Sequence, residues 1–211
     1  MHINRNEMVF LEFKKAFNDY PTFSIHEIEK RMPRFNKMNL IRWQKKGYLQ
    51  KIRSGWYCFT DDNRNELFNY LIANRIYAPS YISMETALSY YGFIPEATFS
   101  ITSVSTLKTN SFSTPLGTYL YKSVKTAAFF GYSLEVHNNK LFKIAAPEKA
   151  LLDFLYFQKN LNELPDMASF RFFSPLINEK IDRNTLLSYA EQFNSKVLLL
   201  RTKLLIKYLD A

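Results

Sequence analysis

The chain has 211 residues, of which 47% are hydrophobic and 17% aromatic, and its formal net charge at pH 7 is +9. This composition excludes intrinsic disorder, and the length is sufficient for one large or two small folded domains. A single cysteine, Cys58, excludes a disulfide framework, and no apolar run reaches the length of a membrane span or forms a signal-peptide core. We therefore expect a soluble, cytoplasmic protein.

The positive charge is concentrated near the N-terminus. Residues 1–60 hold twelve Lys and Arg residues against five Asp and Glu, a net charge of +7, which leaves +2 for the remaining 151 residues. A basic excess confined to one segment is typical of proteins that bind nucleic acid, because the cations neutralise phosphates.

Three helices are predicted in this basic segment. Hydrophobic residues in 5–18 have the spacing of one buried helical face. Ser24 and Glu27 form the pattern of a capping box at the start of a second helix, which ends at Pro33. A third helix, with basic residues on its outer side, ends at Gly47, a residue suited to a left-handed helix stop.

Two short strands follow, Tyr48 to Arg53 and Trp56 to Phe59, joined by the turn residues Ser54-Gly55. Helix, turn, basic helix and basic hairpin is the order of a winged helix-turn-helix. In that design the second helix of the pair enters the major groove and the hairpin reaches the flanking backbone. We expect eight residues on the DNA-binding side: Arg34, Lys37, Asn39, Arg42, Lys45, Lys46, Lys51 and Arg53.

These eight residues have different expected roles. Lys37 and Arg42 lie on the helix that would reach base edges, whereas Lys51 and Arg53 lie on the hairpin and would contact phosphate. Asn39 could read adenine, although capping or solvation explains it equally well. An ordinary solvated surface is the alternative for all the cations. Core packing is favoured over base stacking for the aromatic residues Trp43, Trp56 and Tyr57.

The polar residues around position 62 mark the predicted domain boundary, with a winged helix-turn-helix domain at 1–62 and a larger mixed α/β domain at 63–211. Alternation between Phe99 and Ile144 predicts several strands of a mostly antiparallel sheet. The expected fold class is α+β. Helices are predicted at Glu66–Tyr77, Met84–Tyr91 after a capping Ser83, Pro147–Phe157, Asp182–Phe193 and Lys196–Tyr208.

No pattern in the chain indicates catalysis or cofactor binding. Cys58 and the three histidines, His2, His26 and His137, lack the spacing of zinc ligands, so we expect no metal site. Glu148, Lys149 and Asp153 are explained structurally, by a favourable helix start and an ion pair between residues four apart. We therefore predict no catalytic residue, no cofactor and no enzymatic activity.

Four segments of the chain together resemble the AbiEi antitoxin family. They are Lys46-Gly-Tyr-Leu-Gln-Lys-Ile-Arg-Ser-Gly-Trp-Tyr57, Ser83-Met-Glu-Thr-Ala-Leu-Ser-Tyr-Tyr-Gly-Phe-Ile-Pro-Glu96, Thr114-Pro-Leu-Gly-Thr-Tyr-Leu-Tyr121 and Ala146-Pro-Glu-Lys-Ala-Leu-Leu-Asp153. The order and spacing of the segments carry the resemblance more than any one of them does. Nothing after about residue 161 contributes to it.

The family comprises the antitoxins of bacterial type IV toxin–antitoxin pairs, which are linked to phage defence by abortive infection. The resemblance implies that the N-terminal domain binds repeats in its own promoter and represses transcription. It also implies that the C-terminal domain counteracts a nucleotidyltransferase-like toxin, without requiring a stable complex.

Two expectations about partners remain open to alternatives. The last helix could contact the toxin, since a basic amphipathic helix can dock a partner; simple solvation explains its cations at least as well. The candidate residues are Lys196, Arg201, Lys203 and Lys207. The alternative function for the N-terminal domain is a protein-interaction module that docks on a partner protein without binding DNA.

Overall fold

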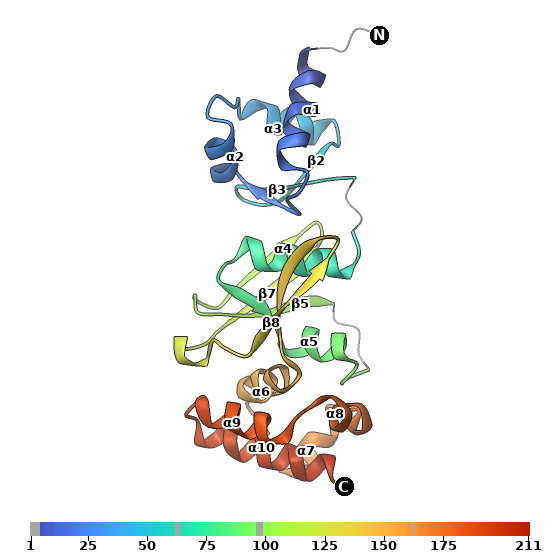
Figure 1. The fold of residues 1–211 in the computed structure, drawn as a ribbon, viewed down its shortest axis with the longest axis vertical. Helices are drawn as coiled ribbons and strands as arrows, with labels where there is room; N and C mark the ends of the chain where they lie inside the picture. The colour runs from blue at the N-terminus through green and yellow to red at the C-terminus, as the bar shows by residue number, and fades with distance from the viewer. Residues whose placement is uncertain (1–4, 62–63, 96–98, 162) are drawn as a thin grey trace.

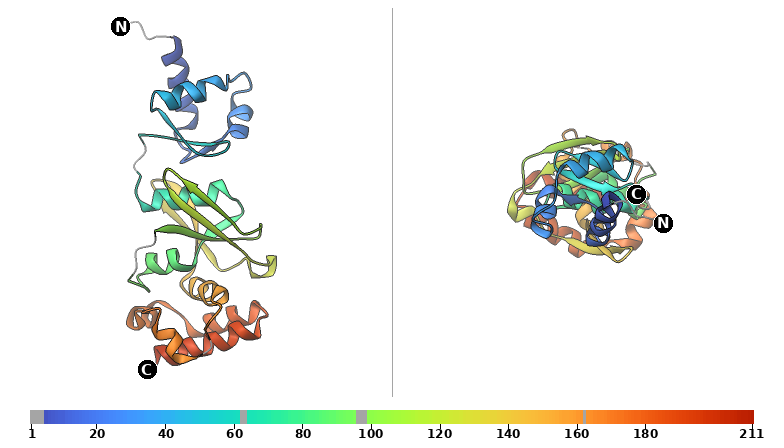
Figure 2. Two further views of the ribbon diagram at one scale, coloured as in Figure 1. Left: turned by 180° about the vertical axis from the view of Figure 1, so that it is seen from behind. Right: turned by 90° about the horizontal axis from the view of Figure 1, so that it is seen from above.

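The computed structural model describes residues 5–61, 64–95, 99–161 and 163–211 (Figure 1). The fold is mixed α+β, with ten α-helices and two mostly antiparallel sheets in these ranges. The elements are stacked along one long axis, so that the first and last helices lie at opposite ends of the molecule (Figures 1 and 2). We call residues 5–61 the N-terminal unit and residues 64–211 the body.

The N-terminal unit places three helices on a small sheet. The predicted capping box is confirmed, since the Glu27 backbone N–H donates to the Ser24 side chain and the Glu27 carboxylate accepts from the Ser24 backbone. Gly47 has φ +71°, the left-handed conformation expected at the helix stop. The strands pair antiparallel in the order β1-β3-β2. The elements are α1 (Arg5–Phe17), β1 (Phe23–Ser24), α2 (Ile25–Arg31), α3 (Met38–Lys45), β2 (Leu49–Arg53) and β3 (Trp56–Phe59).

The small sheet contributes side chains to two hydrophobic cores. Leu49 and Phe59 pack with the three helices, in a core that also contains Phe13, Phe17, Phe23, Ile28, Leu40, Trp43 and Tyr57. Ile52 and Cys58 instead belong to the core of the body, and Trp56 packs against that same core. Because successive strand residues point to opposite faces, one sheet serves both cores.

The body is built on a six-stranded sheet in the order β6-β7-β5-β4-β9-β8. The β5–β7 and β4–β9 pairs are parallel and the other three pairs are antiparallel. The strands are β4 (Ser80–Ile82), β5 (Ser100–Ser105), β6 (Asn110–Thr114), β7 (Gly117–Ser123), β8 (Tyr132–His137) and β9 (Lys140–Ala145).

Seven helices of the body form layers on both sides of this sheet. Helix α4 lies between the sheet and the N-terminal unit, whereas α5 and α6 cover the opposite face, and α7 to α10 form the end layer beyond α6 (Figure 1). The helices are α4 (Glu66–Ile76), α5 (Met84–Tyr91), α6 (Pro147–Phe157), α7 (Leu164–Ala168), α8 (Ser174–Lys180), α9 (Arg183–Gln192) and α10 (Lys196–Leu209).

The predicted helices of the body lie within a residue or two of those observed, and α5 and α6 match their predicted bounds. Four strands and α-helices were not predicted: β1, with two residues, β4, with three, and α7 and α8, with five and seven, are too short to show a hydrophobic period. The predicted domain boundary between residues 62 and 63, together with His2 and Glu96, lies outside the described residues. Within the described ranges, no helix combines the length and apolar character that crossing a membrane requires.

Candidate nucleic-acid interface

The outer face of α3 is an exposed basic surface of the N-terminal unit. Leu40 and Trp43 are buried in the core. The helical repeat therefore turns the residues at positions 38, 41, 42 and 45 toward solvent. In the left view of Figure 2, α3 lies in front of α1. The four outward residues are Met38, Ile41, Arg42 and Lys45.

The cations around α3 differ in how much of their charge is compensated. Lys37, which was predicted to reach base edges, forms an ion pair with Glu29 at the end of α2. Arg42 and Lys45 are exposed and have no ion-pair partner among the described residues. Arg34 is also exposed, and the Lys46 ammonium lies 5.7 Å from the centre of the Tyr48 ring. Arg42 and Lys45 therefore place two uncompensated charges on the C-terminal half of α3.

Two large hydrophobic side chains lie beside these cations and were not predicted as site residues. Met38 is 52% exposed and Ile41 is 48% exposed, whereas Leu40 and Trp43 of the same helix are buried. The sequence contained the signal for them, because a helix that buries Leu40 and Trp43 must expose positions 38 and 41. Asn39 is half-buried, and its predicted contact with adenine stays a prediction.

Arg53, on the hairpin of β2 and β3, points toward the body and not, as predicted, toward a DNA backbone. The Arg53 Nη2 atom donates a hydrogen bond of 2.6 Å to the carbonyl oxygen of Ile76 at the end of α4, and the guanidinium lies 4.5 Å from the centre of the Phe112 ring. Burial lowers the pKa of the Arg53 side chain. The expected phosphate contact by Arg53 is therefore corrected: this residue fastens the hairpin to the body. Lys51, on the same strand, is exposed.

A second arginine strengthens the same junction from the other side. Arg75 of α4 donates from Nε to the carbonyl oxygen of Thr22 at 3.0 Å and from Nη2 to the Glu27 carboxylate at 2.5 Å. The two arginines therefore hold the N-terminal unit against α4. Trp43 and Tyr57 lie in the N-terminal core as predicted, but Trp56 faces the body.

The predicted partner surface on α10 loses one of its four members. Arg201 is only 6% exposed, and it donates to the carbonyl oxygens of Leu155, Leu161 and Lys159 at 2.9, 3.1 and 3.4 Å. These carbonyls end α6 and the segment after it, where backbone acceptors lack helical partners. The prediction that Arg201 contacts a partner is therefore wrong. The other members, Lys196, Lys203 and Lys207, are exposed.

The predicted ion pair of α6 is confirmed, and it is completely buried. Lys149 and Asp153 are both 0% exposed, and Asp153 also accepts hydrogen bonds from Ser83 Oγ at 2.7 Å and from the Tyr81 hydroxyl at 3.0 Å. Burial lowers the pKa of Lys149, while Asp153 opposes that change. Ser83 precedes α5 as predicted, but its hydroxyl binds Asp153 in place of capping the helix.

Glu148 has a structural role too, since its carboxylate accepts a 2.8 Å hydrogen bond from the backbone N–H of Asp182. No group of three or more His, Cys, Asp and Glu side chains is placed to hold a metal ion in the part of the chain that the structure describes.

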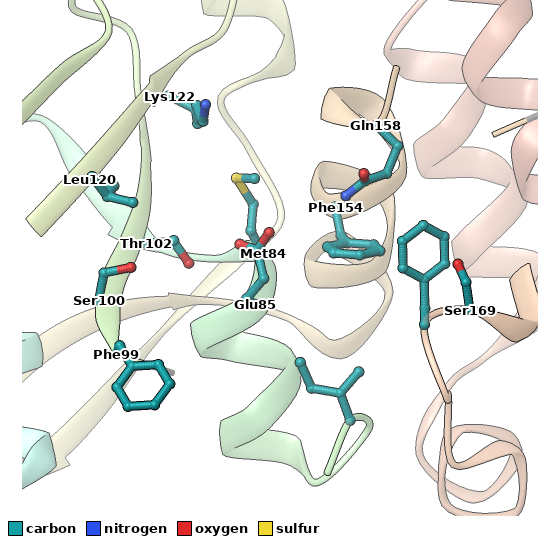
Figure 3. Close-up of a pocket in the computed structure, with 12 residues that line it drawn as sticks. Met84, Glu85, Phe99, Ser100, Thr102, Leu120, Lys122, Phe154, Gln158 and Ser169 are labelled. Carbon is teal, nitrogen blue, oxygen red and sulfur yellow. The ribbon is translucent and has the colours of Figure 1, made fainter. Parts of the chain in front are cut away.

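A pocket of about 710 Å³ lies between the sheet of the body and α6 (Figure 3). Lys122 lies on the sheet side, Phe154 of α6 and Gln158 just after that helix form the opposite wall, and Met84 lies between them. The Glu85 Oε2 atom at this site is buried without a hydrogen-bond partner among the described residues. The volume and mixed lining are those of a site for a small apolar group.

Comparisons with known proteins support the fold. No protein-family model matches the chain, and no curated protein matches it. Among solved structures, the crystal structure of the Rv2827c protein from Mycobacterium tuberculosis is similar, with a TM-score of 0.54 and 12% sequence identity. The match covers 98% of this chain and 82% of that one. At this identity the likeness concerns the fold alone.

Proposed function

We propose that the protein binds double-stranded DNA through the outer face of α3. The observation that carries the proposal is the pair Arg42 and Lys45, which project to solvent from one face of a helix and have no ion-pair partner among the described residues. Exposed cations that no carboxylate compensates are free to bind phosphates or the acceptor atoms of guanine.

The arrangement of the N-terminal unit favours a winged helix-turn-helix. Helices α1, α2 and α3 enclose one core and are followed by the β2–β3 hairpin, which is the element order of that class. The hairpin departs from the usual arrangement, because Arg53 fastens it to α4. We therefore assign base reading to α3 and give the hairpin one phosphate contact, through Lys51.

The resemblance to the AbiEi family suggests which DNA the protein binds and what the body does. By this resemblance, the DNA target is a set of repeats in the protein's own promoter. The body is then the part that counteracts a nucleotidyltransferase-like toxin. Three exposed lysines on α10 stay candidates for contact with that toxin: Lys196, Lys203 and Lys207. In this proposal the protein is a transcriptional autorepressor and antitoxin, and it is not an enzyme.

The test is a titration of the DNA upstream of the gene with the full-length protein, followed by fluorescence anisotropy at several salt concentrations. We expect affinity to fall steeply with salt, because each neutralised phosphate releases counterions. Arg42→Ala should cost about 1–3 kcal/mol of discrimination between the operator and unrelated DNA. Lys203→Ala, at an exposed lysine of α10, is the matched control and should leave that discrimination unchanged.

The rival function is a protein-interaction module in which α3 docks on a partner protein. Absence of a salt-sensitive complex at micromolar concentration would favour this rival. Equal losses for operator and unrelated DNA in Arg42→Ala would remove Arg42 from base reading and leave it a phosphate contact. The two proposed activities can be separated in cells: full-length Arg42→Ala should lose repression of the promoter and still protect against the toxin.

A further inference from the structure

The exposed hydrophobic residues on α3 do not have the surroundings of ordinary surface residues. Single exposed apolar side chains are common on proteins and need no explanation. Met38 and Ile41 are three residues apart on one helical face, about half of each side chain is exposed, and Arg42 and Lys45 flank them. We call these four residues the α3 stripe. Its apolar and cationic side chains complement a partner surface that carries both methyl groups and hydrogen-bond acceptors.

The helical repeat divides the stripe into two rows. Met38 is four residues before Arg42, and Ile41 is four residues before Lys45, so each apolar side chain lies one turn from a cation on the same face. One turn of helix advances about 5.4 Å, whereas successive base pairs are about 3.4 Å apart. Side chains one turn apart on a helix in the major groove therefore reach base pairs one or two steps apart.

The chemistry of the major groove then limits what the apolar side chains can contact. Thymine is the base that presents a methyl group there, whereas guanine presents two acceptors that suit an arginine fork. An apolar side chain over any other base edge would leave hydrogen-bonding groups without water or partner. The favourable ligand for the stripe is thus thymine close to guanine.

We propose that Met38 and Ile41 contact thymine methyl groups, and so select thymine within two base pairs of the guanine that Arg42 reads. This inference rests on the proposed function, because it requires α3 to lie in the major groove. It assigns sequence selection to residues that no charge count would indicate. Two of the residues first expected to read bases are less suited: Lys37 is paired with Glu29, and Asn39 is half-buried.

The experiment begins with the full-length protein and selection of tightly bound duplexes from a randomised pool. Each thymine of the selected site is then replaced singly by uracil, which removes only the methyl group. We expect one or two positions at which affinity falls about fourfold, the effect of withdrawing one buried methyl group. Replacement at other thymines should leave the affinity unchanged.

Variants of the protein assign the methyl contacts to their side chains. At the thymine that Ile41 contacts, Ile41→Ala should bind the thymine and uracil duplexes with equal affinity. Met38→Ala should do the same at the thymine that Met38 contacts. Arg42→Ala should weaken both duplexes and preserve the ratio between them. Leu200→Ala is the matched control, since Leu200 is 58% exposed on α10, and it should behave as the parent protein does.

The outcomes separate this inference from the function on which it rests. Salt-sensitive, selective binding with no sensitivity to uracil at any position would overturn the methyl contacts and leave DNA binding intact. Failure to select any duplex would overturn both. A uracil effect that persists unchanged in Ile41→Ala and Met38→Ala would assign the methyl contacts to other residues and thereby refute the inference.

Discussion

The N-terminal unit and the body contain the same two basic residue types in opposite surroundings. On α3, Arg42 and Lys45 extend into solvent with no carboxylate partner among the described residues. In the body, Lys149 and Arg201 are buried, and both donate hydrogen bonds to groups of the chain itself. The difference shows that acceptors on distant elements decide whether a cation is enclosed or left exposed, whereas its position on a basic helix does not.

The largest effect that would test this contrast is expected at Lys149. Replacement by methionine leaves Asp153 buried without its cation, so Lys149→Met should lower the free energy of unfolding by about 3–5 kcal/mol. Urea denaturation followed by circular dichroism measures the change. Lys45→Met on α3 is the control and should change the same quantity by no more than about 0.5 kcal/mol. Equal stability of the two variants would contradict the difference proposed between the buried Lys149 and the exposed Lys45.

The effect at Arg201 is expected to be somewhat smaller. Arg201→Met removes the donors for three backbone carbonyl oxygens and should cost about 2–3 kcal/mol of unfolding free energy, because buried acceptors then lack partners. Lys203→Met, two residues further along α10, replaces an exposed lysine and provides the comparison. A destabilisation by Lys203→Met as large as that by Arg201→Met would show that α10 is generally fragile, and that the carbonyl contacts are not the cause.

The smallest of the three stability effects is expected at the junction between the two regions. Arg53→Ala removes a hydrogen bond to Ile76 and the contact with Phe112, at a cost of about 1–2 kcal/mol. Its DNA affinity should keep the salt dependence of the parent protein. Lys51→Ala should do the reverse: it leaves stability unchanged and reduces the salt slope by about 1. A reduced salt slope in Arg53→Ala would show that Arg53 contacts DNA phosphate after all.

Much of the fold could be predicted from local signals in the sequence. The capping box at Ser24, the left-handed stop at Gly47 and the proline that starts α6 at Pro147 each fix a helix boundary within a few residues. The order of the strands in the larger sheet could not be predicted, because pairs such as β4–β9 join residues about sixty positions apart. Hydrophobic periodicity contains no information about such distant pairing.

The candidate site was only partly predictable, for a related reason. An exposed cation and a buried one look alike in sequence when the acceptor lies on a distant element, as Ile76 does for Arg53 and Leu155 does for Arg201. One signal was available for the hairpin, since β3 reads Trp56-Tyr-Cys-Phe59 with no polar residue. A strand that is apolar on both faces is covered on both faces. That pattern predicts a docked hairpin in place of a projecting one.

The two-sided burial of the small sheet has a consequence for how this chain can evolve. A recombination event that joined residues 5–61 to an unrelated protein would bring the strands without α4 and expose Ile52, Cys58 and Trp56. The new neighbour would need a matching apolar surface, together with acceptors for Arg53. Substitution of the outward residues of α3 is much less constrained, because these residues contact neither core. Under the proposed function, new operator sequences are accessible by point substitution on that helix, whereas new combinations of unit and body require coordinated change on both sides of the junction.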